Sequence, residues 1–285
     1  MPGTVTTNLP LPADNHVHSE WSWDASAGAM LESCAMAEQL GLPAIAFTDH
    51  ADFTDWAFPG GGREDTPWTR LVDAHATSGL LDLDGYLACL DRCRLAYPGL
   101  CILSGVELGE CHVFAEEAGE LVARAGGFDR VLGSLHSLEV DGRLQYAPTL
   151  MTPGQAQDTM RAYLAETHRM IEQSSLFGVL AHIDYPMRAW PKTGPPFRVE
   201  DYEEEYRTVL RALAGSGRAL EVNTHGPWPA VPVVSWWYQE GGAAISFGSD
   251  AHAPARVAKD FRQAAAMVEA CGFRAGHDPT DFWRR

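Results

Sequence analysis

Histidine and carboxylate side chains recur at the ends of short apolar runs in this sequence. The clearest cases are His16-Val17-His18, Thr48-Asp49-His50 and Asp250-Ala251-His252. Residues two positions apart in a β-strand point to the same face, so the two outer side chains of a pair with this spacing can reach one ion. Imidazole nitrogens and carboxylate oxygens together suit a divalent transition metal. These patterns therefore predict a metal site.

Further candidate ligands stand at the ends of other apolar runs, namely Glu107, His136 and His182. A single histidine is more often a surface residue or a hydrogen-bonded core residue than a metal ligand. Repetition of the same feature at so many run ends argues against coincidence. We therefore expect buried strands to deliver these side chains to one mouth of the fold.

Short apolar runs alternate along the chain with segments of helical spacing. The runs lie near residues 14–18, 44–48, 102–107, 130–136, 178–183, 219–224 and 244–249. Such alternation predicts an α/β fold in which parallel strands are joined by helical crossovers, with the chemistry at the C-terminal ends of the strands. A closed barrel is favoured over an open doubly wound sheet, because an open sheet draws ligands from two or three strand ends and here nearly every strand contributes.

Length and composition limit the protein class. The 285 residues are 46% hydrophobic and show no shift in composition, so we expect residues 1–285 to form a single domain. The formal charge of −17 disfavours a nucleic-acid surface, although a metal site can still attract an anion. The six cysteines form no C-x-x-C pair, and no leader or membrane-length apolar stretch is evident. We expect a cytoplasmic protein without membrane contact.

The segment from Ala51 to Asp84 is long and rich in Gly, Pro and Trp. Long connections of this kind are typical of a lid over a substrate, or of a surface excursion packed by its own aromatic residues. The sequence leaves both interpretations open.

Several motifs, taken in order, resemble those of the polymerase and histidinol phosphatase (PHP) superfamily. They are Asp14–His18, Phe47–His50, Gly105–Glu107, Leu132–His136, Leu180–Asp184 and Phe247–His252. Their order and rough spacing fit this superfamily from about residue 14 to the last helix. The resemblance implies a distorted seven-stranded β/α barrel, a (β/α)7 barrel, with a trinuclear metal centre at the C-terminal ends of the strands.

The same resemblance implies how the ligands divide among three ions. The three sets are His16, His18, Glu107 and Asp250; Glu107, His136 and His182; and Asp24, His50 and His252. Glu107 would bridge the first two ions. Asp24 stands where some members carry His and others Asp, and its alternative role is an N-terminal helix cap. Mixed His and carboxylate ligands favour two to three divalent ions of Zn, Mn or Fe over Mg or Ca.

A centre of this kind predicts direct hydrolysis of a phosphate monoester. Closely spaced ions generate hydroxide from water near neutral pH and clamp a phosphoryl group. Glu107 and Asp250 would hold the metals at the reacting atoms. The leaving oxygen needs a metal or a proton, and either His252 or a water in the site would supply that proton.

The substrate is expected from the branch of the superfamily that the chain resembles. The segments Leu132–His136 and Glu221–Thr224 are similar to the histidinol phosphatase branch, which implies L-histidinol phosphate. Arg188 is the expected phosphate ligand, since a planar guanidinium suits bidentate recognition. Branch members commonly carry an Arg shortly after the second segment, and this chain does not. His225 and Arg63 are the expected substitutes.

Other functions are kept as alternatives. A related phosphoesterase acting on a nucleotide or oligonucleotide phosphate would need basic or aromatic platforms, and in this chain the aromatic residues are present but the bases are scarce. A nonenzymatic remnant would tolerate ligand losses, whereas this ligand set is complete. An amidohydrolase-type barrel acting on C–N bonds would usually carry a Lys or carboxylate bridge on a central strand, and no such Lys is evident. The expected partner is a small phosphorylated substrate.

Overall fold

The computed structural model describes residues 11–56, 70, 73, 80–226 and 228–285. The candidate substrate ligand Arg63 and most of the segment predicted as a lid or surface excursion lie outside these residues. Among the residues described, no helix is both long enough and apolar enough to cross a membrane.

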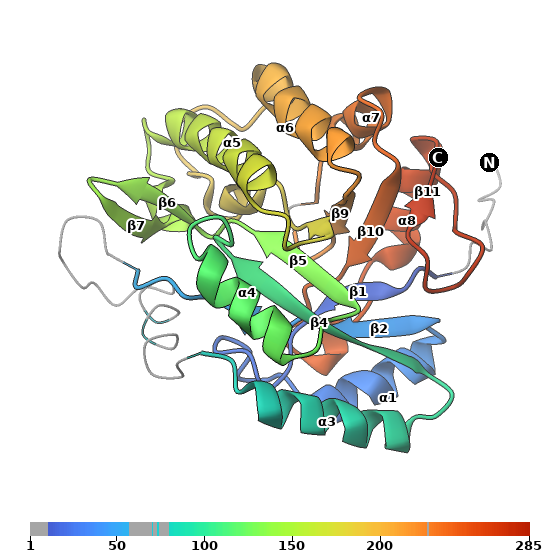
Figure 1. Ribbon diagram of the computed structural model, residues 1–285. Helices are drawn as coiled ribbons and strands as arrows, with labels where there is room; N and C mark the ends of the chain where they lie inside the picture. The colour runs from blue at the N-terminus through green and yellow to red at the C-terminus, as the bar shows by residue number, and fades with distance from the viewer. Residues whose placement is uncertain (1–10, 57–69, 71–72, 74–79, 227) are drawn as a thin grey trace.

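Within the described residues, seven parallel strands follow one another across a curled nine-stranded sheet (Figure 1). In their spatial order they are β1 (Asp14–Val17), β2 (Ala44–Phe47), β4 (Cys101–Gly109), β5 (Arg130–Ser134), β8 (Val179–Leu180), β9 (Ala219–Asn223) and β10 (Ala244–Gly248). Each of the apolar runs predicted to be a strand overlaps one of them, and β4 extends beyond its run at both ends. The short β3 (His50–Ala51) pairs with β4, and β11 (Trp283–Arg284) adds an antiparallel edge to β10.

The sheet returns on itself at a seam between β1 and the residues that follow β10. Val17 forms an isolated parallel bridge with Ala251. The N–H of His18 donates to the carbonyl of Ala251 at 2.9 Å, and the N–H of Asp250 donates to the carbonyl of His16 at 2.7 Å. The α/β fold and the distorted barrel predicted from the sequence are therefore confirmed. The segments that carry His16 and Asp250, far apart in the sequence, are hydrogen-bonded to each other across the seam.

Asp14 stabilises this seam. Its fully buried carboxylate accepts hydrogen bonds from the backbone N–H of Ser249 and of Ala258, both at 2.9 Å. Burial raises the pKa of Asp14 to about 6, and the hydrogen bonds from Ser249 partly offset that rise. One side chain thus joins β1 to two points of the segment that carries Asp250 and His252.

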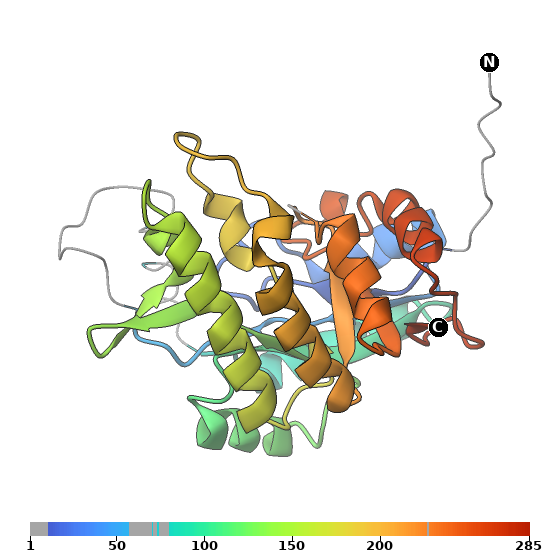
Figure 2. The ribbon, with the colours of Figure 1, turned by 90° about the horizontal axis from the view of Figure 1, so that it is seen from above.

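Helices cover the outside of the sheet in two groups (Figures 1 and 2). α1 (Met30–Leu40) and α3 (Leu83–Ala96) pack together on one side, while α5 (Ala156–Gln173), α6 (Glu203–Gly215) and α7 (Val231–Gln239) lie side by side on another. α4 (Ala115–Arg124) and α8 (Phe261–Ala270) complete the outer layer. The buried apolar faces of these helices pack with strand side chains in one large hydrophobic cluster. This packed core supports the carboxyl ends of the strands.

Several elements were not predicted from the sequence, among them a hairpin and a helix. A hairpin of β6 (Ser137–Val140) and β7 (Arg143–Tyr146) directly follows His136. Its turn residues Asp141 and Gly142 both have positive φ, the conformation that tight hairpins favour. The helix α7 lies in a Pro- and Trp-rich stretch, and its Pro232 occupies the first turn, where proline costs no hydrogen bond.

Gly105, within β4, lies where a side chain would collide with its surroundings. A Cβ at this position would lie 2.6 Å from Thr48 Cγ2 and 2.9 Å from the carbonyl oxygen of Phe47. The Gly105 N–H also donates to the phenol oxygen of Tyr86 at 2.9 Å, and the phenol O–H donates to Phe47 O at 2.7 Å. The close approach of β2 and β4 therefore requires glycine here.

We expect Gly105→Ala to lower the free energy of unfolding by about 1–3 kcal/mol, because the backbone carbonyl cannot rotate away from the added methyl group. Urea unfolding followed by circular dichroism measures this loss. Gly99→Ala is the matched control, since nothing lies within 4 Å of its Cβ position. Equal midpoints for Gly105→Ala and the wild type would contradict the packing described here.

Candidate metal centre

All the side chains predicted as metal ligands meet at the carboxyl ends of the strands. They fall into overlapping groups whose nitrogen and oxygen atoms lie within 4.8 Å of one another. Most of these side chains are buried, with Asp24 and His252 at the more open rim. The strand-end positions predicted from the sequence therefore converge in space.

The first group consists of two histidines from the end of β1 and two carboxylates. His16 Nε2 lies 3.0 Å from His18 Nε2 and 3.2 Å from Glu107 Oε2. His18 Nε2 lies 3.3 Å from Glu107 Oε2 and 3.3 Å from Asp250 Oδ1. Donors arranged tetrahedrally around zinc at about 2.1 Å lie about 3.4 Å from each other. The spacing of His16, His18 and Glu107 fits one ion, and Asp250 Oδ1 lies beside His18 and 3.8 Å from His16 Nε2.

The tautomers of the two histidines are fixed by their other ring nitrogens. His16 Nδ1 lies 2.7 Å from Glu221 Oε1, and an ionised carboxylate only accepts, so Nδ1 carries the proton. His18 Nδ1 lies 2.9 Å from Ser22 Oγ, whose own hydrogen goes to Asp49 Oδ1 at 2.6 Å. Both Nε2 atoms therefore face each other, and either a proton on one ring or a metal ion can lie between them.

The charges of the group favour a positive charge at this position. Burial opposes protonation of His16, yet the carboxylates of Glu221 and Glu107 outweigh it and raise the pKa of His16 well above its usual value. Burial likewise opposes ionisation of Glu107, but His16 and His50 hold the pKa of Glu107 well below its usual range. The carboxylates are thus ready to act as ligands at neutral pH, and a divalent ion would compete with protons for the rings.

Glu107 also belongs to a second group through its other oxygen. Glu107 Oε1 lies 2.7 Å from His182 Nε2 and 3.3 Å from His136 Nε2. Ser134 Oγ donates to the same oxygen at 2.5 Å and fixes the orientation of the carboxylate. Because Oε2 faces the β1 histidines and Oε1 faces the second pair, the side chain has the geometry expected of a bridging ligand.

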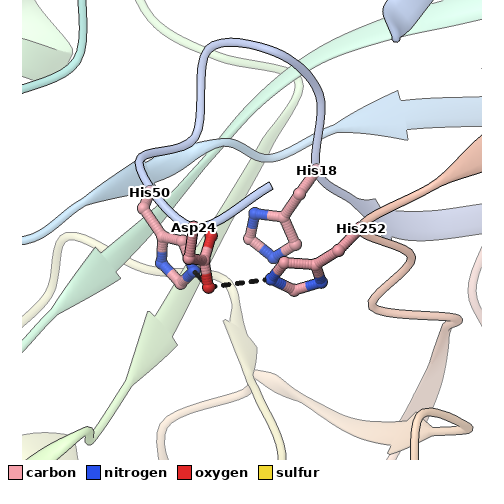
Figure 3. A group of neighbouring side chains, drawn as sticks. All are labelled: His18, Asp24, His50 and His252. Atoms are coloured by element: carbon pink, nitrogen blue, oxygen red, sulfur yellow. Dashed lines mark hydrogen bonds and ion pairs between the residues drawn. The ribbon is translucent and has the colours of Figure 1, made fainter. Parts of the chain in front are cut away.

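A third group lies at the rim of the centre (Figure 3). Asp24 Oδ2 is 3.0 Å from His252 Nε2 and 3.4 Å from His50 Nε2, with the ring of His18 beside them. Asp24 Oδ1 is buried, and within the described part of the chain it has no hydrogen-bond partner. The first helix begins only at Met30, so Asp24 caps no helix and its carboxylate is free to take a cation. The residues therefore fit two or three divalent ions.

The candidate substrate ligands Arg188 and His225 both lie beside Asp250. Arg188 Nη2 donates to Asp250 Oδ2 at 2.5 Å, and its guanidinium lies 4.6 Å above the ring of Tyr185. Burial alone would lower the pKa of Arg188, but Asp250 outweighs this and raises it, so the guanidinium stays charged. His225 Nδ1 lies 2.8 Å from the carbonyl oxygen of Asp250. Burial lowers the pKa of His225, which favours a neutral ring.

Residues that orient the ligands were missed by the sequence reasoning. Glu221 and the Ser22–Asp49 pair orient the two β1 histidines, as described above. Asp52 Oδ1 lies 3.0 Å from His136 Nδ1. The spacing of Asp52, two residues after His50, was the available signal, because it repeats the same-face spacing of His16 and His18. Such supporting hydrogen bonds fix the tautomer and orientation of ligand histidines.

The fold and the site define the class of protein: the chain belongs to the PHP domain family, whose model matches residues 14–225. Among individual proteins, it is 27% identical over 273 residues to the histidinol-phosphatase of Lactococcus lactis, covering 91% of each chain. It is 24% identical over 259 residues to a probable histidinol-phosphatase of Thermotoga maritima, covering 88% of each. By its family and its buried ligand groups, the chain is a metal-dependent phosphatase that resembles histidinol-phosphatases.

Solved structures share the fold. A crystal structure of the Lactococcus lactis histidinol phosphate phosphatase, complexed with Zn, L-histidinol and phosphate, superposes with a TM-score of 0.75 at 23% identity, covering 95% of this chain and 98% of that one. A putative histidinol phosphatase from Listeria monocytogenes superposes with a TM-score of 0.71 at 18% identity, covering 88% and 99% of the two chains. The likeness extends over nearly the whole chain.

The division of ligands predicts different metal losses for two conservative variants. Glu107→Gln should cost about two ions per chain, because the residue faces two groups, whereas Asp24→Asn should cost about one. Elemental analysis after dialysis against buffered zinc measures both. His168→Gln, a partly exposed position paired with Glu172, is the control. Equal losses in the two site variants would show that Glu107 does not bridge.

Proposed function

We propose that this protein hydrolyses a small phosphate monoester, most specifically L-histidinol phosphate to L-histidinol and phosphate, with two or three ions of Zn, Mn or Fe. The observation that carries the proposal is Glu107, whose two oxygens face two ligand groups beside the charged Arg188. Similarity to histidinol-phosphatases along 91% of the chain supports the narrower substrate. The ligand-bound Lactococcus lactis structure, with Zn, L-histidinol and phosphate, supports both the metal and the substrate class.

The protein's own part in the reaction is to hold charge and geometry fixed. When bound, the ions supply Lewis-acid charge for the phosphate oxygens and an activated nucleophile. Glu107 holds two of the ligand groups at a constant separation, and Ser134 keeps its carboxylate from rotating. Asp250 joins the first group to Arg188, since Oδ1 faces His18 and Oδ2 accepts from the guanidinium. A phosphate placed beside Asp250 would thus meet a fixed cationic side chain.

Arg188 is proposed to bind the phosphate, and His225 to bind the substrate as a neutral hydrogen-bonding ring. Arg188 is held on two sides, by the carboxylate of Asp250 and by the face of Tyr185. The hydroxyl of Tyr185 in turn contacts that of Tyr146 at the end of the β6–β7 hairpin. A guanidinium fixed in this way loses little conformational entropy on binding an oxyanion.

The Nε2 atom of His252 can act either as a metal ligand or as a proton donor, but not as both at once. Its Nδ1 lies 3.0 Å from the carbonyl oxygen of Asp250, so Nδ1 donates and Nε2 faces Asp24. Nε2 then either binds an ion or carries a proton for the leaving oxygen. We propose the ligand role whenever the third group holds an ion. In that state the leaving oxygen takes its proton from another donor or is stabilised by metal charge.

The first experiment is phosphate release from a panel of L-histidinol phosphate, nucleoside phosphates and sugar phosphates, run beside elemental analysis. We expect two to three transition-metal ions per chain and selective turnover of L-histidinol phosphate, lost after chelation and restored by Zn or Mn. Selective turnover of another phosphate ester would support the proposed metal-dependent hydrolysis but exclude L-histidinol phosphate as the substrate. A fully metal-loaded chain inactive on every phosphate would refute the proposed reaction.

Replacement of Arg188 tests the phosphate ligand. We expect Arg188→Ala to raise the Michaelis constant about 10- to 100-fold, and Arg188→Lys to restore part of the loss, because lysine keeps the charge without the planar fork. Metal content must be measured in parallel, since Arg188 also contacts Asp250. Arg211→Ala, an exposed arginine paired with Glu204, is the control. Unchanged kinetics in Arg188→Ala would exclude the assignment.

A further inference from the structure

Asp52 lies between two ligand histidines that belong to different groups. Its carboxylate is buried and lies 3.0 Å from His136 Nδ1 through Oδ1 and 3.3 Å from His50 Nδ1 through Oδ2. His136 is a ligand of the second group and His50 of the third. One carboxylate therefore contacts the outward ring nitrogen of a ligand from each group.

The inward nitrogens of both rings face other carboxylates. His136 Nε2 lies 3.3 Å from Glu107 Oε1, and His50 Nε2 lies 3.4 Å from Asp24 Oδ2. An imidazole that binds an ion through Nε2 carries its proton on Nδ1, and that N–H needs an acceptor. Asp52 Oδ1 accepts from His136 Nδ1, whereas His50 Nδ1 hydrogen-bonds to no described residue and lies 3.3 Å from Asp52 Oδ2 and 3.2 Å from Glu107 Oε2. This pattern favours an orienting role for Asp52 over direct ligation.

Asp52 also contacts the loop that carries Asp24. The indole N–H of Trp23 donates to Asp52 Oδ2 at 2.9 Å, and the Trp23 ring lies 5.4 Å from the ring of His50. Because Trp23 immediately precedes Asp24, this hydrogen bond fixes the backbone from which the Asp24 carboxylate projects. Two members of the third group thus depend on Asp52, together with one member of the second.

Glycine at position 109 makes room for this carboxylate. A Cβ on Gly109, the last residue of β4, would lie 2.0 Å from Asp52 Oδ1 and 3.4 Å from His136 Nδ1. Any side chain there would push Asp52 away from His136. Position 109 therefore offers a way to displace Asp52 without replacing any ligand or Asp52 itself.

We propose that Asp52 is a positioning residue shared by the second and third ion sites, so that these two sites bind their ions as a coupled pair. The histidines of the first site are oriented by other side chains, Glu221 and Ser22 with Asp49, although Ser22 Oγ also accepts from the backbone N–H of His50. This inference rests on the metal centre proposed above. It adds that disturbing one carboxylate outside the ligand set empties two sites together.

The test is zinc binding, read by elemental analysis after dialysis against a series of buffered free zinc concentrations. At a concentration that just saturates the wild type, Asp52→Asn should retain about one ion per chain, because its two ions bind about 10- to 100-fold more weakly. Asp24→Asn should retain about two, since it removes a ligand of the third site only. The double variant should match Asp52→Asn, because the third site is already empty.

Gly109→Ala should reproduce the loss of two ions seen in Asp52→Asn, while Gly178→Ala, whose Cβ position has open space around it, should bind zinc like the wild type. Circular dichroism of the chelator-treated proteins shows whether each variant folds. If Asp52→Asn fails to fold, Gly109→Ala decides the question.

Three results would overturn the proposal. They are full zinc binding in Asp52→Asn, loss of a single ion, and loss of ions in Asp52→Asn without a matching loss in a folded Gly109→Ala. Zinc binding by the wild type distinguishes a failure of this inference from a failure of the proposed metal centre. A wild type that binds no zinc overturns the centre and the role of Asp52 with it, whereas a wild type with three ions and an equally loaded Asp52→Asn overturns only the role of Asp52.

Discussion

Two buried imidazole nitrogens that face each other at 3.0 Å are the constraint on which the rest of the site depends. His16 and His18 cannot relieve the contact by exchanging tautomers, because Glu221 and Ser22 each accept a proton from the opposite side of the ring. In a buried setting, lone pairs at this distance repel strongly unless a proton or a metal ion lies between them. The polypeptide therefore folds into an arrangement that holds positive charge between these rings, as a proton or as a metal ion, and the carboxylates Glu107 and Asp250 balance that charge.

The side chains of the first group can come together only if the barrel closes. Asp250, which completes the first group, follows β10, more than two hundred residues after β1, and a backbone hydrogen bond across the seam places it. Asp14 adds a buried carboxylate that binds the same segment twice. A rigid sheet suits this task, because ligand atoms must be held within about 0.5 Å of their productive positions. The packed helices and core serve the site by keeping the strand ends in register.

Strand positions and ligand types were predictable because they are local. The spacing of His16 and His18 fixes their common face, and an apolar run before Glu107 marks a buried strand that ends in a charge. The supporting residues were not predictable in the same way. Glu221 meets His16 only through the neighbouring positions of β1, β9 and β10 around the barrel, and nothing near position 221 in the sequence specifies that contact. The β6–β7 hairpin and α7 were missed because their segments contain turn and proline residues, which in isolation are typical of loops.

The three ligand groups differ in how the fold supports them. His16 and Glu107 lie within or directly after long-range strand pairs and are almost fully buried, with side-chain exposures of 0% and 1%. Asp24 and His252 project from irregular segments, with exposures of 13% and 24%. Ligands on loops are held less firmly than ligands on strands, and water reaches them more easily. The third group therefore depends most on side-chain hydrogen bonds for its shape. Asp52 contributes to that shape, because it accepts a hydrogen bond from Trp23, the neighbour of Asp24, and its Oδ2 lies 3.3 Å from His50 Nδ1.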